Sequence, residues 1–264
     1  MTPEQLRSAI ADSVAAAVGA GELPPEARGG PPGGVPLRPA EVRPTGADAD
    51  WVSPVAIRWA PSLRLSPRGV ATVLAERLCG RPDVDAVAVV GDGLLALTLS
   101  DAARSSIVPA ILAAPDRYAA GGLGYVRVPD EPAGSRPPGD PVRRVQLSHA
   151  RLCRLLRNAA AAGVLLRGGE RVEELALESE RRLLVALADQ PERLARHACD
   201  DQELLRAVAD LAARADGWTH PLRPARLGEP VLAVHGARVA LATAARIVLR
   251  NGLARLGASA PERM

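Results

Sequence analysis

Residues 145–159, which read VQLSHARLCRLLRNA, decide the fold of the second half of this chain. Apolar residues recur there at intervals of three and four, the spacing that places side chains on one face of an α-helix. The apolar face consists of Val145, Leu152, Leu155 and Leu156. Another side is basic and consists of Arg143, Arg151, Arg154 and, at its margin, Arg144. The stretch therefore predicts an amphipathic helix with a basic stripe.

The sequence that follows continues with further helical segments. After residue 142, short polar or Gly-containing joints separate stretches of helical periodicity at 143–162, 170–188, 191–198, 201–215 and 236–256. Short connections between successive helices favour an antiparallel arrangement. We therefore expect an all-α antiparallel helical bundle over residues 142–264.

The last predicted helix also places arginines side by side. Arg246 and Arg250 are four residues apart, opposite an apolar face formed by Val239, Leu241, Ile247, Val248 and Leu253. Like charges at this spacing destabilise a helix by roughly a few tenths of a kcal/mol unless an anion compensates them, and phosphate is the natural candidate. Solvated arginines are an equally weighted alternative, because all 33 basic residues of this chain are Arg.

The first half predicts a small α/β domain. Thr2 and Gln5 form a capping box around a proline at the first helical position, so a helix to about Gly19 is expected. Residues 21–50 are rich in Pro and Gly and predict mostly loop, with one edge-like strand within VPLRPAEVRP (35–44). The remaining expected elements are helices at 53–59 and 66–78, a hairpin formed by DAVAVV and LLALTLS around Gly91–Gly93, and a helix over 101–113.

Residues 114–141 separate the two halves and are too dense in Gly and Pro for a regular element. We expect an N-terminal domain over residues 1–114, a Pro/Gly-rich linker over 115–141 and the helical bundle over 142–264. The predicted fold class is α+β.

Composition limits the classes of protein to which the chain can belong. The net charge of +3 is too small to predict nucleic-acid binding by itself. Three cysteines that are distant in sequence indicate neither a disulfide framework nor a zinc site. Charged residues such as Glu4 and Arg7 interrupt any signal-peptide core, and no run reaches membrane-spanning length. We expect a cytoplasmic protein with no membrane partner.

Catalytic motifs are missing from the sequence. The four histidines show no metal-ligand spacing, and neither a GxSxG elbow nor a GxGxxG or GxxxxGK[ST] loop occurs. The glycine-rich GGPPGGV (29–35) contains prolines that remove backbone donors, and no helix follows it to bind phosphate. We therefore expect no enzyme active site, no cofactor and no metal.

The stretch VQLSHARLCRLLRNA resembles the first helix of the DALR anticodon-binding domain of arginyl-tRNA synthetases, in which a run of the form VQ-x-x-HAR-[IL]-C-x-[IL]-LR introduces the domain. ESERRLLVALADQPERLARHA (178–198) is similar to the second helix of that family and its break at Pro191. RNGLARLGASAPERM (250–264) resembles the end of those synthetases. More weakly, the N-terminal part resembles their additional domain, with Gly91–Leu94 in place of a Gly-Pro-Gly-Phe turn and 51–60 in place of a helix.

The resemblance also shows what this chain lacks. The family has a class I Rossmann domain between these parts, whose HxGH motif and Lys-containing KMSKS loop bind ATP and activate arginine. Here only the linker stands between them, no His precedes His149, and the sequence contains no Lys. Pro54 replaces an Asn that reads a D-loop base in the family, and Thr219 replaces a Tyr beside Trp218. The resemblance therefore implies a chain that does not aminoacylate alone.

Three functional hypotheses follow. The leading one is a non-catalytic arginyl-tRNA synthetase paralogue that binds tRNA, with arginine tRNA as the natural choice, through the DALR domain. Its RNA-binding residues would be Arg143, Arg144, Arg151, Arg154, Arg246 and Arg250 for phosphate, Trp218 as a stacking platform, and Asn251 of the family-like terminus. The alternative is a protein-interaction or regulatory scaffold that has lost RNA binding and docks on a full-length synthetase or another protein. A weaker alternative is one subunit of a split arginyl-tRNA synthetase.

Overall fold

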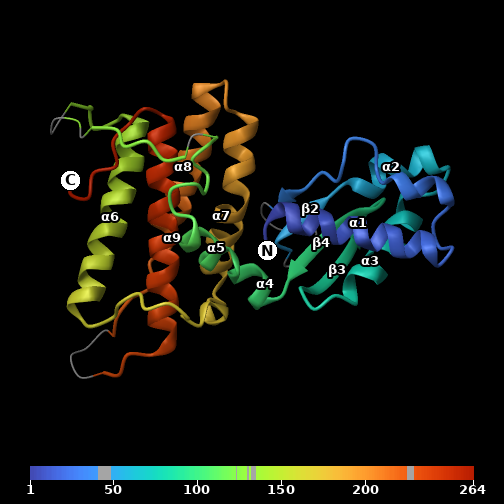
Figure 1. The fold of residues 1–264 in the computed structure, drawn as a ribbon, viewed down its shortest axis with the longest axis horizontal. Coiled ribbons are helices and arrows are strands. Elements are labelled where there is room, and N and C mark those ends of the chain that lie inside the picture. Colours follow the sequence, from blue (N-terminus) through green and yellow to red (C-terminus); the bar gives the residue numbers. More distant parts are fainter. Residues whose placement is uncertain (41–48, 123, 130, 132–134, 225–228) are drawn as a thin grey trace. The chain divides into compact units, whose positions relative to one another are not determined.

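Figure 1 shows the computed structural model of the chain, which describes residues 1–40, 49–122, 124–129, 131, 135–224 and 229–264. Contacts divide the chain into two compact units, residues 1–104 and 105–264, and each is described by itself. The first contains a sheet and the second is helical, so the predicted α+β class is confirmed. Part of the predicted strand at 35–44 and five residues of the predicted linker lie outside the described residues.

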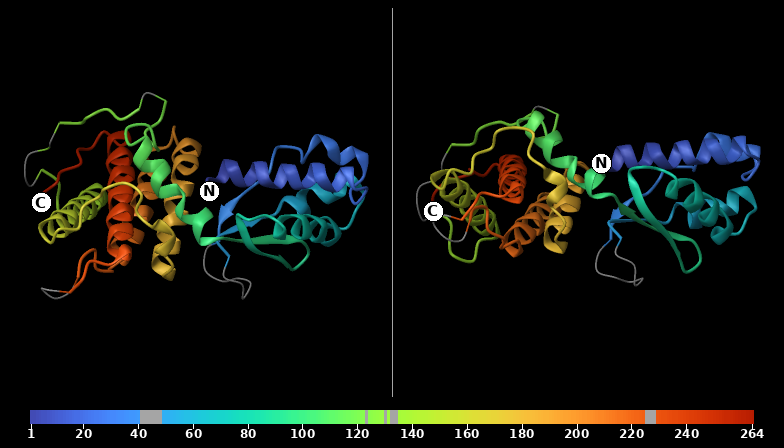
Figure 2. Two further views of the ribbon diagram at one scale, coloured as in Figure 1. Left: turned by 60° about the horizontal axis from the view of Figure 1, so that its bottom comes forward. Right: turned by 90° about the horizontal axis from the view of Figure 1, so that it is seen from below.

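The first unit is a small antiparallel sheet covered by helices. Its elements are α1 (Pro3–Gly19), a 3-10 turn η1 (Pro25–Gly29), β1 (Arg38–Pro39), β2 (Trp51–Ser53), α2 (Val55–Leu63), α3 (Pro67–Cys79), β3 (Val84–Val90), β4 (Leu94–Leu99) and α4 (Asp101–Ser105), which ends just past the boundary. The strand order is β1-β2-β4-β3 with every neighbouring pair antiparallel. Helix α3 packs on the β3–β4 hairpin, and α1 and α2 pack on α3 (Figure 2).

The predicted hairpin is confirmed, and its turn requires glycine. Val90 pairs with Leu94 at the end of the ladder, so the turn consists of residues 91–93. Gly93 has φ +130°, and a Cβ built on it would lie 2.8 Å from the backbone of Pro67. A side chain at this position would meet both an unfavourable backbone conformation and a steric clash. The close approach of the turn to the start of α3 therefore depends on Gly93.

Strand β2 was not predicted from the sequence. Trp51 pairs with Leu97 and Ser53 with Leu95, and the Trp51 side chain is 1% exposed. The strand is only three residues long and ends just before α2. Helix α2 begins at Val55, two residues after the predicted start. So short a segment has no periodicity of its own, and its pairing with β4 is what makes it a strand.

An ion pair is buried at the end of the sheet in the first unit. The Arg104 guanidinium donates to both carboxylate oxygens of Asp50 at 2.8 Å and also to the backbone oxygen of Leu99. The side chains of Arg104 and Asp50 are only 2% and 8% exposed. The Asp50 carboxylate also accepts the Leu99 N–H, so this pair connects α4, β4 and the residue that precedes β2.

The helix predicted over 101–113 is interrupted. It forms α4 and then α5 (Ile107–Ala113), which are separated at Ser106. Ile107, Val108 and Ile111 are completely buried, because α5 packs on helices of the second unit. The two units consequently divide between Arg104 and Ser105, ten residues earlier than the boundary expected from the sequence.

The second unit is a helical bundle. It contains α5, α6 (Pro141–Ala161), the 3-10 turn η2 (Val172–Glu174), α7 (Glu178–Arg196), α8 (Asp201–Gly217) and α9 (Ala233–Arg255). Helix α6 packs on α8 and α9, α7 packs on α8, and α5 packs on α9 and α7. Figure 1 shows α6 and α9 running in opposite directions, as an antiparallel bundle requires. The core is built largely from Leu, Val and Ala side chains.

The break predicted at Pro191 is wrong. Helix α7 runs without interruption from Glu178 to Arg196, with Pro191 inside it. Proline has no N–H to donate, so the carbonyl of Leu187, four residues earlier, loses its helical partner. The Tyr118 hydroxyl donates to that carbonyl at 2.8 Å and replaces the missing bond. A distant residue therefore satisfies the polar group that would otherwise favour a break.

Candidate nucleic-acid interface

The basic stripe of α6 is fixed by the start of the helix. The Asp140 carboxylate accepts the backbone N–H groups of Val142 and Arg143 at 2.7 and 3.2 Å, and Pro141 occupies the first helical turn. Val145 and Leu152 are then completely buried. Arg144 and Arg154 lie on the exposed side, while Arg143 and Arg151 are intermediate. The amphipathic character predicted for this helix is confirmed.

A groove runs along part of this stripe, and we call it the arginine groove. It has a volume of about 490 Å³. Its walls come from α6, from the end of α8 and from the segment after α9, and they comprise Leu147, Ser148, Ala150, Arg151, Arg154, Arg157, Asp216, Glu262, Arg263 and Met264. Four arginines face two carboxylate side chains there. The groove therefore has an excess of positive charge.

Within the groove, Arg151 is largely engaged by the protein itself. Its guanidinium donates to the backbone oxygens of Ala215 and Trp218 at 3.0 and 3.1 Å and lies 3.3 Å from the Asp216 carboxylate. These acceptors lie at the end of α8, where helix carbonyls lack partners. Arg151 thus connects α6 to the end of α8. Because Asp216 also compensates its charge, Arg151 is less available to a ligand in the groove than an unpaired arginine would be.

Arg154 is the most available cation of the groove. It is exposed, and no residue in the described part of the chain forms a hydrogen bond or ion pair with it. One turn further along α6, Arg157 donates to the backbone oxygen of Glu262 at 3.2 Å, and the described residues offer it no ion-pair partner. A guanidinium with unused donors on an exposed face is the side chain that a phosphate oxygen can reach most directly.

The expectation that Trp218 offers a stacking surface is wrong. Its side chain is 1% exposed and belongs to the core of the second unit. Trp218 follows α8 directly, and its backbone N–H donates to Arg214. Its indole nitrogen is buried and has no hydrogen-bond partner among the described residues. A buried ring leaves no face on which a base could stack.

Asn251 and Arg250 are used inside the protein as well. Asn251 is completely buried, and its amide donates to the backbone oxygens of Pro115 and Tyr118 at 2.8 and 2.7 Å. A direct contact of Asn251 with RNA is therefore excluded in this conformation. Arg250 donates to the Asp116 carboxylate at 2.6 Å and lies 4.0 Å from the centre of the Tyr125 ring. Both residues therefore connect α9 to residues 115–118, which follow α5.

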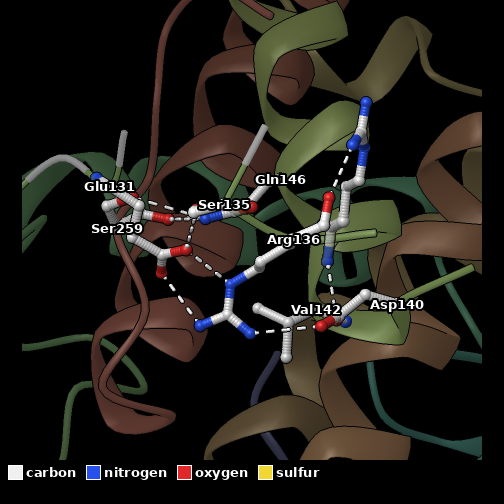
Figure 3. A network of polar contacts seen from close by, with 8 residues as sticks. Glu131, Ser135, Arg136, Asp140, Val142, Gln146 and Ser259 are labelled. Atoms are coloured by element: carbon white, nitrogen blue, oxygen red, sulfur yellow. Dashed lines mark hydrogen bonds and ion pairs between the residues drawn. The ribbon is translucent and has the colours of Figure 1, made fainter. Parts of the chain in front are cut away.

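A second cavity lies on another side of α6 and is lined by Arg143, Arg246 and Arg250. Its volume is about 960 Å³. We call it the strap cavity because residues 125, 127, 128, 131, 135 and 136, which we call the strap, line it together with α6, α9 and residues 259–264. Figure 3 shows the polar contacts of the strap. Arg136 donates to the Glu131 carboxylate at 2.6 Å within it, and the backbone N–H of Glu131 donates to the Ser259 hydroxyl, which connects it to the segment after α9. Gln146 of α6 donates to the backbone oxygen of Ser259.

His149 lines the strap cavity, and the Cys153 sulfur lies 3.9 Å from its Nδ1. His149 is 3% exposed and its Nδ1 lies 3.0 Å from the Pro261 oxygen, which identifies Nδ1 as the protonated nitrogen. Burial lowers the pKa of His149, and the nearby Arg246 and Arg250 lower it further. Burial also raises the pKa of the neighbouring Cys153 thiol. Both side chains are therefore neutral near pH 7 and leave the charge of Arg246 uncompensated.

The structure thus separates the predicted RNA-binding residues into groups. Arg151 and Arg154 line the arginine groove, Arg143, Arg246 and Arg250 line the strap cavity, and Arg144 lines neither. Sequence reasoning did not select Arg157 or Arg263, although Arg157 is in the helix that supplied the stripe. It also missed Arg127 and Arg136, because they belong to a segment that was interpreted as a linker.

Comparisons with known proteins show what the helical part of the chain is similar to. Residues 145–264 match the DALR anticodon binding domain family. The chain is 40% identical over 128 residues to an arginine–tRNA ligase of Kineococcus radiotolerans, covering 47% of this chain and 23% of that protein. It is 39% identical over 134 residues to the ligase of Clavibacter sepedonicus, covering 50% of this chain and 24% of that protein.

Among solved structures, the arginyl-tRNA synthetase of Thermus thermophilus is 27% identical to the matched part, with a TM-score of 0.38, and the match covers 46% of this chain and 21% of that one. The chain spans about a quarter of the length of the curated relatives it matches. Residues 145–264 thus match the DALR anticodon binding domain, and over about half of its length the chain is similar to arginine–tRNA ligases.

Proposed function

We propose that this protein binds tRNA through its DALR domain, with the arginine groove as the contact surface, and that it does not aminoacylate tRNA itself. The observation that supports this most is the exposed Arg154, which has unused donors in a groove with excess positive charge. Arginine side chains on such a surface bind backbone phosphates without reading sequence. The match of residues 145–264 to an anticodon-binding domain supports tRNA as the RNA.

The binding proposal predicts a specific effect of Arg154→Gln. The substitution removes one phosphate contact without disturbing a partner inside the protein. We expect tRNA affinity to fall severalfold, and the slope of log K against log salt to become less negative by about 1. Binding of labelled tRNA should be measured by filter retention or fluorescence anisotropy from low to near-physiological salt.

Arg206→Gln is the matched control for this experiment. Arg206 lies on α8, its side chain is 61% exposed, and it is absent from both cavities. If the two variants lose affinity equally, the arginine groove is not the binding surface and only diffuse charge attracts the RNA. A loss confined to Arg154→Gln supports the groove.

The proposal that the chain is non-catalytic rests on what the chain shares with its relatives. The matched region lies in the anticodon-binding part, and the sequence contains no Lys with which to build the family's ATP-binding loop. Incubating the purified protein with arginine, ATP and total tRNA should give no arginyl-tRNA above a protein-free control, whereas a full-length synthetase should charge the same sample. Charging that co-purifies with this chain through successive columns would contradict the proposal.

The bound RNA is proposed to be tRNA with an arginine anticodon. Sequencing the tRNA that the protein retains at near-physiological salt tests this point separately. Enrichment of arginine tRNAs supports retained anticodon reading. Binding without enrichment would mean that contact is made through phosphates alone, since the buried Trp218 provides no stacking contact.

A further inference from the structure

We infer that the strap cavity is a second anion site that takes a phosphate-bearing ligand of nucleotide size. It adjoins the arginine groove, with which it shares Glu262, Arg263 and Met264. Six arginines line it, namely Arg127, Arg136, Arg143, Arg246, Arg250 and Arg263, together with the carboxylates of Glu131 and Glu262. Its volume of about 960 Å³ falls in the range of sites for small organic ligands.

Internal ion pairs compensate only part of this charge. Arg136 is paired with Glu131, and Arg250 is paired with Asp116. Within the described residues, no carboxylate lies within ion-pair distance of the other four arginines, which are Arg127, Arg143, Arg246 and Arg263. Among the side-chain carboxylates that line the cavity, Glu262 remains to oppose their charge. An anion that enters the cavity would therefore meet several unpaired guanidinium groups at once.

Arg246 is the residue on which the inference depends most. Its Nε is buried and has no hydrogen-bond partner among the described residues. A buried donor without an acceptor costs free energy that a bound oxygen atom would recover. The neighbours His149 and Cys153 supply no negative charge, because burial lowers the pKa of the histidine and raises that of the thiol. The vacant hydrogen-bonding capacity thus lies where the protein itself offers no anion.

The arginines of the cavity come from different segments of the chain, and for this reason we expect a ligand that carries more than one phosphate group. Arg246 and Arg143 belong to the helices α9 and α6, whereas Arg127 belongs to the strap. Several guanidinium groups from different segments of the chain match the distributed charge of a polyphosphate, as in a nucleoside triphosphate or in successive phosphates of an RNA backbone. Phosphate is the chemistry that these sources share.

The test is calorimetric titration of the full chain with pyrophosphate, ATP and a short 5′-hydroxyl RNA. We expect saturable binding of at least one probe, with Arg246→Gln and Arg127→Gln each weakening it by about tenfold, as expected for a lost charge-assisted hydrogen bond. Arg127 is exposed on the strap, so its variant keeps the fold even if substitution of the half-buried Arg246 disturbs packing. Arg206→Gln is the control and should bind every probe as the original chain does, because Arg206 is exposed and lines neither cavity.

The outcomes also identify the phosphate source. If ATP or pyrophosphate binds and the RNA does not displace it, the ligand is a small polyphosphate; if the RNA binds with the same dependence on Arg246 and Arg127, the source is the RNA backbone. The inference is overturned if no probe binds saturably, or if binding is equal in the original chain and both variants. The proposed tRNA-binding function is judged independently, because its variant, Arg154→Gln, lies outside the strap cavity.

Discussion

Replacing Arg104 with alanine is expected to lower the free energy of unfolding of residues 1–104 by about 3–5 kcal/mol, the usual result of breaking a buried ion pair. The substitution leaves the Asp50 carboxylate in a site where its side chain is only 8% exposed. It also removes the donor to the Leu99 carbonyl at the end of β4. Asp50 keeps the Leu99 N–H, but one hydrogen bond does not replace a bidentate guanidinium.

Denaturant unfolding of the full chain, followed by tryptophan fluorescence, measures this effect. Trp51 and Trp59 are both buried in the first unit, so their emission reports its unfolding. Arg77→Ala is the matched control, because Arg77 forms an ion pair with Glu22 in the same unit but at the surface. Its loss should be much smaller, since water replaces an exposed partner. Equal losses of unfolding free energy in the two variants would show that the buried Asp50–Arg104 pair contributes no more to stability than an exposed pair does.

Trp218→Ala is expected to destabilise the second unit by about 3–5 kcal/mol, the cost of removing a large aromatic side chain from a core. The side chain is 1% exposed, so truncation leaves a cavity between helices. The indole nitrogen lacks a partner among the described residues, and its removal offsets a small part of the cost. Unfolding should be followed by circular dichroism of the helices, because the variant loses the tryptophan of this unit.

Trp218→Leu separates a packing role from an RNA-binding role. Leucine retains apolar volume but provides no aromatic face, so we expect a smaller loss of stability and unchanged tRNA affinity. If Trp218 stacked on a base, the same variant would lose affinity corresponding to about 1–3 kcal/mol. Such a loss in a folded protein would refute the buried role that the structure gives to this residue.

Local sequence patterns were sufficient for most helices and for the hairpin. Thr2 and Ser66 cap α1 and α3 through hydrogen bonds to Gln5 and Gly69, and both caps involve residues three positions apart. The hairpin likewise depends on neighbouring strands and a glycine turn. Interactions of this range can be inferred from spacing alone. The strand β2 could not, because its register depends on β4, more than forty residues away.

For the candidate sites, the sequence predicted where positive charge gathers but not which arginines remain available. Arg154 and Arg250 look alike in the sequence, as basic residues on amphipathic helices. Folding leaves the first exposed and pairs the second with Asp116 and the Tyr125 ring, more than a hundred residues earlier in the chain. The strap cavity brings Arg127 and Arg136 together with residues of α6 and α9 that are distant in sequence.

The sequence by itself determined the α+β class, the amphipathic bundle helices and the relation to the DALR domain, because each depends on short-range periodicity or on a contiguous motif. Tertiary structure alone decided that α7 continues through Pro191 and that Trp218 and Asn251 are buried. In each of these cases the deciding partner is distant in sequence: the Tyr118 hydroxyl satisfies the carbonyl of Leu187, and the backbone oxygens of Pro115 and Tyr118 bind the amide of Asn251. Desolvation and hydrogen-bond satisfaction depend on all neighbours in space, and no local pattern encodes them.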